Sequence, residues 1–176
     1  MRFLDDLKYY VELDSHSKGF VGIVNVLLFS SGFHFLCILR LARFVKKIPG
    51  AGNVLAKFFS YCGVMVYGCH VSPNASLGAR LYFPHPVGIV IGADWTIGNS
   101  VTIMQNVTLG KKSPKVQQKS RSIISDRVMV CAGAVIVGEV VIGDGVIVGA
   151  NSVVINSIGE NSLAVGVPAI EKKMVK

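Results

Sequence analysis

Residues 91–110 read IGADWTIGNSVTIMQNVTLG and carry one pattern four times. An aliphatic residue recurs at every sixth position, at Ile91, Ile97, Ile103 and Leu109, and a glycine follows three of these four. Neither an α-helix nor a β-hairpin has a six-residue period. A triangular solenoid has this period, because each hexad forms one flat face and three hexads complete a coil.

The six-residue period extends beyond this stretch in both directions. Large apolar residues in phase are Val71, Leu77 and Phe83 before it and Ile124, Val130, Ile136, Ile142, Val148 and Val154 after it. The period is interrupted twice, by two extra residues around Pro84-His85-Pro86 and by an insertion over 111–121. Loops that leave a solenoid without breaking its register commonly carry functional sites. We therefore expect sites at the first interruption and at the loop insertion spanning 110–123.

The first part of the chain has helical periodicity instead. We expect a helix over 21–28 that Asp14 or Ser15 caps, a break at Ser31-Gly32, and helices over 33–47 and 53–67. The prediction is a mainly β protein with an apolar α-helical N-terminal region, a short cap, over 1–67 and a β-solenoid domain over 68–176.

One apolar stretch leaves the role of this region open. Residues 19–39 contain no formally charged side chain, which approaches the about 20 residues needed to span a bilayer. Asn25 and His34 interrupt the stretch, and four acidic residues before it argue against a signal peptide. Burial in the helical cap is the favoured interpretation. A transmembrane span and peripheral membrane contact, aided by the basic residues that follow, are the alternatives.

Composition excludes some classes of protein and favours others. With 51% hydrophobic and 16% charged residues, the chain is not globally disordered. A net charge of +8 suits anionic lipid or a phosphate-rich cofactor, whereas the lack of a nucleic-acid-binding module argues against nucleic acid. The four cysteines have neither CxxC spacing nor the spacing of metal ligands, so we expect reduced thiols and no metal site. Reduced thiols are typical of a cytoplasmic protein, which would work in solution or at the inner face of the membrane.

Four segments in order resemble the hexapeptide-repeat acyltransferases, and within them the serine O-acetyltransferase branch, which includes acetyltransferases of surface-polysaccharide biosynthesis. These segments are HVSPNA (70–75), HPVGIVIG (85–92), NSVTIMQNVTLG (99–110) and VGVPA (165–169). The resemblance implies a left-handed parallel β-helix and acetyl-CoA as co-substrate. It also implies a homotrimer, in some members a dimer of trimers, with active sites between subunits.

His85 matches the catalytic histidine of that family. A hydroxyl is a poor nucleophile until it loses its proton, and a neutral imidazole can accept that proton at cellular pH. The oxygen would then attack the acetyl thioester directly, with a backbone N–H of the same tight loop as the expected oxyanion donor. His70 stands where the family has an aspartate that orients the histidine, so we expect a second catalytic role there. The alternative for His85 is a turn residue held between two prolines.

The expected acceptor follows from two departures from the family. Pro84 replaces the acidic residue that binds the serine amino group, and residues 119–122, KSRS, replace a histidine-bearing segment. A sugar hydroxyl of a surface polysaccharide is therefore the favoured acceptor, with Arg121 and Trp95 as candidate contacts. The alternative for Trp95 is a residue that fills a corner of the solenoid. The alternatives are serine O-acetylation in cysteine biosynthesis and a non-catalytic, trimeric, membrane-associated scaffold.

Small residues along a coil edge are needed where the pantetheine arm of acetyl-CoA binds backbone groups. Candidates for this cofactor contact are Gly110, Ala132, Gly133, Ala134, Gly149 and Ala150, and the nearby Lys111 and Lys112 are candidates for its phosphates. The competing interpretation is that these are ordinary corner residues and solvated lysines. Cys131 is expected to be a buried structural thiol rather than a nucleophile.

Overall fold

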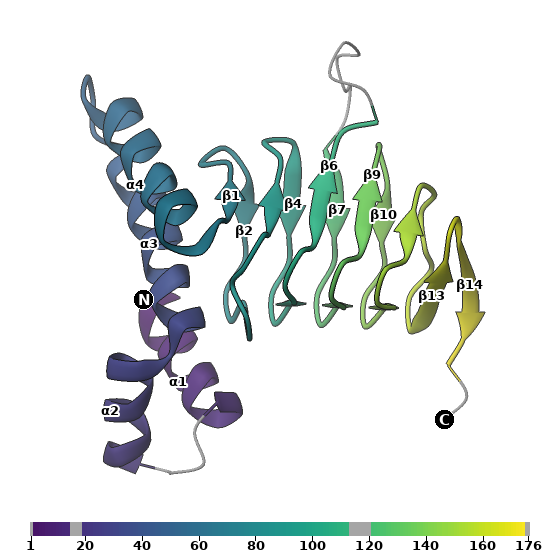
Figure 1. Ribbon diagram of the computed structural model, residues 1–176, viewed down its shortest axis with the longest axis horizontal. Coiled ribbons are helices and arrows are strands. Elements are labelled where there is room, and N and C mark those ends of the chain that lie inside the picture. Colours follow the sequence, from purple (N-terminus) through teal and green to yellow (C-terminus); the bar gives the residue numbers. More distant parts are fainter. Residues whose placement is uncertain (1, 15–18, 113–120, 175–176) are drawn as a thin grey trace.

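The computed structural model describes residues 2–14, 19–112 and 121–174, so residues 113–120 of the predicted loop insertion lie outside it. Four helices form a layer at one end of an elongated stack of strands, and the chain ends at the other end of that stack (Figure 1). The helices are α1 (Arg2–Asp14), α2 (Gly19–Phe29), α3 (Ser31–Val45) and α4 (Gly52–Tyr67). We refer to these four helices as the cap.

The strands form the predicted left-handed parallel β-helix. They are β1 (His70–Val71), β2 (Ser76–Leu77), β3 (Val90–Ile91), β4 (Trp95–Ile97), β5 (Thr102–Ile103), β6 (Thr108–Gly110), β7 (Ser122–Ile124), β8 (Met129–Val130), β9 (Val135–Val137), β10 (Val141–Ile142), β11 (Ile147–Val148), β12 (Val153–Val154), β13 (Ser162–Gly166) and β14 (Ala169–Lys173). Three sheets have the orders β1-β3-β6-β9-β12, β2-β4-β7-β10 and β5-β8-β11-β13-β14. Every pair is parallel except β13–β14, which ends the stack as an antiparallel hairpin.

The predicted hexad residues are the interior of the solenoid. Ile91 pairs with Leu109 and Leu109 with Ile136 in neighbouring coils, and all three are fully buried. A coil without an insertion is 18 residues long, as between Val90 and Thr108, which is three hexads. The sequence pattern missed a second interior position two residues earlier, where Val101, Val107, Val128 and Val146 are buried as well.

The helical predictions hold apart from their boundaries. The break falls at Ser30, one residue before the predicted Ser31-Gly32, and the Ser30 hydroxyl caps α3 by accepting a hydrogen bond from the Phe33 N–H. The expected cap of the second helix is wrong for Asp14, which is the last residue of α1, and Ser15 lies outside the described residues. Gly68 ends α4 with φ +62°, a conformation that glycine adopts without steric cost.

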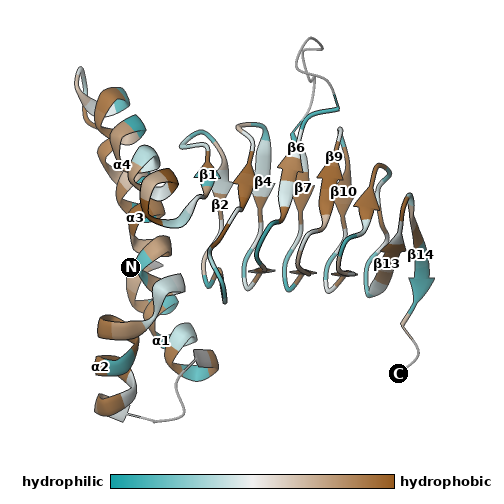
Figure 2. Cartoon of the chain, in the orientation of Figure 1, coloured by the Kyte–Doolittle hydropathy of each residue, from teal (hydrophilic) through white to brown (hydrophobic). Residues whose placement is uncertain are grey.

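The apolar stretch is divided between two helices. Within the described part of the chain, no single helix is long and apolar enough to cross a membrane, whereas α2 and α3 pass that test together but meet at a 70° bend. Figure 2 shows hydrophobic colour along α2, α3 and α4. Seven residues of α3 are buried, and four of them belong to the same hydrophobic core as the solenoid interior: Phe33, Phe35, Leu36 and Leu39.

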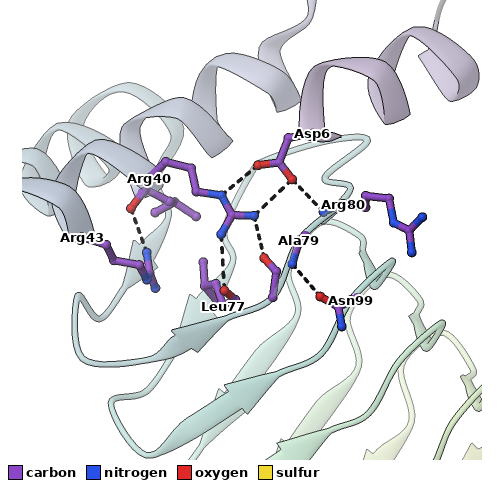
Figure 3. Close-up of polar contacts among 9 residues, drawn as sticks. Asp6, Arg40, Arg43, Leu77, Ala79, Arg80 and Asn99 are labelled. Atoms are coloured by element: carbon purple, nitrogen blue, oxygen red, sulfur yellow. Dashed lines mark hydrogen bonds and ion pairs between the residues drawn. The ribbon is translucent and has the colours of Figure 1, made fainter. Parts of the chain in front are cut away.

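The cap covers the open edge of the first coil. Strands of the first coil have no preceding coil to pair with, so their outer carbonyl and N–H groups need other partners. Arg40 of α3 donates to the carbonyl oxygens of Leu77 and Gly78, at 3.4 and 2.6 Å. The Arg80 N–H donates to the Asp6 carboxylate of α1 at 2.7 Å (Figure 3).

These groups form one partly buried network, which we call the cap clamp: Asp6, Arg40, Leu77, Gly78 and Arg80. The guanidinium of Arg40 holds the Asp6 carboxylate with two hydrogen bonds, of 2.9 and 3.1 Å. The Asp6 side chain is 2% exposed and that of Arg40 is 15% exposed. A bidentate pair with little exposure is geometrically specific, and it fixes α1 and α3 against the first coil.

Arg43 extends the contact along the same edge. It donates to the carbonyl oxygens of Ala75, Ser72 and Leu39. Burial, followed by the neighbouring charge of Arg40, lowers the pKa of the Arg43 guanidinium to about 10. The first coil therefore receives side-chain partners where a further coil would have supplied backbone partners.

Candidate active site

His85 lies on a tight turn at the first corner after Phe83. Val71 and its strand partner Ile91 are 20 residues apart, whereas Ile91 and its partner Leu109 in the next coil are 18 apart. The turn at His85 accommodates the two additional residues. The Val87 N–H donates to the His85 carbonyl at 2.8 Å, and the Asn106 N–H donates to the Val87 carbonyl at 2.8 Å. The His85 side chain is exposed while Pro86 is buried, so the turn is anchored and presents the imidazole to solvent.

Gly88 closes the turn in a conformation that favours glycine. Its φ is +65°, and a Cβ there would lie 2.2 Å from Oδ1 of Asn106. Asn106 itself has φ +58° and stands directly before an interior valine. Asparagine tolerates this left-handed conformation better than most residues. The sequence analysis missed Asn106, although an asparagine just before an interior position of a hexad indicates a corner residue with positive φ.

The cap supports the His85 turn from behind. The Tyr10 hydroxyl of α1 accepts a hydrogen bond from the Phe83 N–H at 2.9 Å, and the Phe83 ring packs edge-on against Phe35 of α3, with centroids 5.2 Å apart. Gly32 of α3 approaches so closely that a Cβ there would lie 2.0 Å from the Phe83 carbonyl oxygen. Two helices therefore fix the residue two positions before His85.

Gly32→Ala is expected to destabilise the fold by about 1–3 kcal/mol, because the new methyl group meets a backbone carbonyl that cannot turn aside. The displaced Phe83 would also move His85, so a reaction that uses this imidazole as its base should have a lower kcat. Gly63→Ala in α4 is the matched control, since its Cβ would meet ordinary contacts at 3.5 and 3.6 Å. Thermal unfolding and steady-state kinetics of both variants test this, and equal behaviour of the two would contradict it.

His70 lies next to the exit of the His85 turn. It begins β1, its side chain is exposed, and its N–H donates to the Ile89 carbonyl at 2.8 Å. Its neighbour Cys69 is 1% exposed and accepts a hydrogen bond from the Ile89 N–H at a donor–sulfur distance of 3.4 Å. Burial raises the pKa of the Cys69 thiol, so Cys69 holds the turn in place as a neutral group. The structure thus brings His70 and the His85 turn together at one corner.

A backbone oxyanion donor in this turn stays a prediction. The N–H groups of Val87 and Ile89 donate within the fold, and Pro84 and Pro86 have none, so His85 and Gly88 are the residues of the turn that could supply it.

The edge that carries His85 continues through the next coils. Ala132, Gly133, Gly149 and Ala150 lie on it, and Gly133 donates its N–H to the Gln105 carbonyl of the coil before. These four predicted cofactor contacts therefore share the edge of His85. Ala134 is a correction, because it is fully buried and both its N–H and its carbonyl bond within the solenoid.

Cys131 lies on the same edge and is half-buried. Burial raises the pKa of its thiol, which favours the neutral form over the nucleophilic thiolate. All four cysteines are free.

The remaining predicted contacts lie on a different edge. Gly110, at the end of β6, is followed by the exposed Lys111 and Lys112, and Arg121 is exposed just before β7. Lys111 forms an ion pair of 2.6 Å with Asp94. The five steps along the chain from Asn106 to Lys111 cross one face of the solenoid, a span of roughly 15 Å. One copy of the chain therefore does not bring Arg121 or Lys111 to His85.

Trp95 is a second correction. It is 1% exposed and fills the solenoid interior of β4 beside Ile97. A side chain in that position cannot contact an acceptor, so the alternative of a corner-filling residue is the one observed.

Comparison with known proteins places this geometry in a family. No protein-family model matches the chain. A serine acetyltransferase of Staphylococcus epidermidis is 34% identical over 136 residues, which are 77% of this chain and 61% of that protein. The chain thus spans about three fifths of the length of this curated relative.

Solved structures agree in fold over almost the whole chain. Soybean serine acetyltransferase complexed with serine superposes with a TM-score of 0.85 at 32% identity, covering 97% of this chain and 68% of that one. A serine acetyltransferase in complex with CoA gives a TM-score of 0.84 at 29% identity, with coverage of 97% and 68%. The chain belongs to the hexapeptide-repeat acyltransferases, in the serine acetyltransferase-like branch.

Proposed function

We propose that the protein is an acetyl-CoA-dependent O-acetyltransferase with His85 as its general base. The observation that carries this proposal is the exposed imidazole on a turn that Gly88, Asn106 and Phe83 hold rigidly, in a chain of this family. The CoA-bound relative supports the choice of co-substrate.

The reaction needs one group of the protein to move a proton. The His85 imidazole removes the proton from the acceptor hydroxyl as its oxygen forms a bond to the acetyl carbonyl carbon. The tetrahedral oxyanion collapses, the carbon–sulfur bond breaks, and the thiolate of coenzyme A takes the proton back from the imidazolium. No acyl-enzyme intermediate is required, which agrees with the raised pKa of Cys131.

L-Serine is the acceptor that the relatives favour, because the similar proteins described above are named serine acetyltransferases and one is complexed with serine. The sugar acceptor favoured by the sequence is not confirmed. It stays a second candidate on one observation: the half-buried Pro84 beside His85 offers no carboxylate for a substrate ammonium.

Two copies of the chain are required in this proposal. His85 lies on one edge of the solenoid, whereas Lys111 and Arg121 lie on another. A neighbouring copy therefore has to bring its Lys111 and Arg121 to the site that contains His85. A homotrimer, with each site between two subunits, satisfies this requirement by symmetry.

Thiol release from acetyl-CoA by the purified protein tests the proposal. We expect release with L-serine, and O-acetylserine as the product in mass spectrometry. Release with a sugar but not with serine would favour the second candidate. Absence of both acetyl-CoA binding and turnover with every acceptor would favour the non-catalytic scaffold and refute the enzyme.

A further inference from the structure

The hairpin of α3 and α4 exposes a series of large apolar side chains. We call this series the hairpin surface: Phe44, Ile48, Val54, Phe58, Tyr61 and Met65. Phe44 and Val54 are each 70% exposed and Met65 is 67% exposed. Apolar side chains that gather on one helix face, rather than being scattered singly, indicate an interaction surface.

The helical spacing of α4 places the hairpin surface opposite its packed face. Val54, Phe58, Tyr61 and Met65 follow one another by four, three and four residues, so they form one stripe. Gly52, Ala56 and Gly63, which are buried, lie about half a turn away at 100° per residue. The small residues pack α4 against its neighbours, and the large apolar residues point away from the protein.

Positive charge accompanies the hairpin surface. Lys47 and Lys57 are exposed on the two sides of the hairpin bend, and Lys46 beside them donates a hydrogen bond to Asn74. From residue 15 to residue 93 the sequence contains no Asp or Glu. The charge of these lysines is therefore not neutralised by an acidic residue of the same helices.

Exposed apolar side chains together with lysines that have no acidic neighbour indicate which kind of partner binds the hairpin surface. A second copy docked face to face would bring two sets of lysines together without an opposing carboxylate, which is unfavourable. An anionic bilayer accepts large apolar side chains below its headgroups and attracts lysines at their level. The helix α2 also exposes Phe20 and Phe29, but it has no charged side chain to complement such a surface.

We propose that the hairpin surface docks the protein on an anionic lipid membrane, with Phe44 and Phe58 inserted and Lys47 and Lys57 at the headgroups. Contact is peripheral, because the opposite face of α4 stays packed on the protein. This proposal is independent of the acetyltransferase activity.

Co-sedimentation with lipid vesicles tests the docking. The full chain is expected to sediment with vesicles of equal parts phosphatidylcholine and phosphatidylglycerol, and to stay in solution with phosphatidylcholine alone. Lys47→Gln and Lys57→Gln should each weaken binding about fivefold. Phe44→Ser and Phe58→Ser should each weaken it about tenfold or more. Added salt should reduce the contribution of the lysines and leave that of the phenylalanines.

Matched controls lie at the far end of the solenoid. Lys172→Gln and Lys173→Gln remove the same charges from β14, and Val167→Ser and Ile170→Ser remove exposed apolar side chains there. These four variants are expected to bind as the unchanged protein does. Failure of the unchanged protein to bind the anionic vesicles would overturn the proposal, as would equal losses in the control variants. Sedimentation velocity tests the alternative that a second copy of the chain binds the hairpin surface. If the unchanged protein does not bind vesicles and Phe58→Ser forms a smaller oligomer than the unchanged protein, the hairpin surface is an interface between two copies.

Discussion

Replacing His85 with alanine is expected to lower the turnover of acetyl-CoA by about 10²–10⁴-fold, the usual contribution of a positioned general base. The imidazole is exposed and on a turn that the cap and Asn106 fix, so its loss removes the base without disturbing packing. The effect should fall on kcat, with the affinity for acetyl-CoA unchanged, because the interaction is made with the acceptor proton in the transition state. Stopped assays of thiol release, with binding of acetyl-CoA measured separately, give the two quantities.

His34→Gln is the control for that measurement. The imidazole of His34, in α3, bonds to the Leu27 carbonyl of α2 at 2.7 Å, a contact between two helices of the cap. His34→Gln should leave turnover within about twofold of that of the unchanged protein, as is usual for a substitution away from a functional site. Retention of full turnover by His85→Ala would refute the role of His85 and make His70, at the same corner, the next base to test.

The solenoid could be predicted from sequence because its interior is one-dimensional. Each coil repeats the contacts of the coil before, so a period of six in Ile91, Ile97 and Ile103 determines three faces at once. The second interior position was missed because the residues there vary more in size and polarity, from Trp95 to Ser122, and show no common type. For the same reason the sequence left Trp95 open between an acceptor contact and a residue that fills the solenoid, and the structure shows the second.

The site could be predicted only in part. The interruption of the register located His85, because an extra residue in a solenoid can only leave as a loop. The sequence could not predict that the candidate cofactor contacts lie on two different edges of the solenoid, because small residues occur at every corner. The supports of the turn, Tyr10 and Gly32, were also missed, because they come from helices that lie 73 and about 50 residues away along the chain.

The cap clamp is where the second large effect is expected. Asp6→Leu should destabilise the protein by about 3–5 kcal/mol, the usual cost of leaving one member of a buried ion pair without its partner. The guanidinium of Arg40, 15% exposed, would keep only the carbonyls of Leu77 and Gly78, and the Arg80 N–H would lose its acceptor. Thermal unfolding should shift down by about 10 °C for a chain of this size. Asp5→Leu, one residue earlier on the exposed side of α1, is the control and should change stability by less than about 0.5 kcal/mol.

The double variant Asp6→Leu, Arg40→Met distinguishes two contributions to stability, that of the Asp6–Arg40 ion pair and that of the hydrogen bonds to the edge of the first coil. If the clamp were only an ion pair, two apolar residues of similar volume could replace it with little loss, as often happens for buried pairs. The carbonyl of Gly78 and the N–H of Arg80 would, however, remain at the open edge without these partners. Unsatisfied buried groups cost about 1–3 kcal/mol each, so recovery should be incomplete. Full recovery of the unfolding temperature would show that the cap holds the first coil by packing alone, and that its charged side chains do not replace the missing coil.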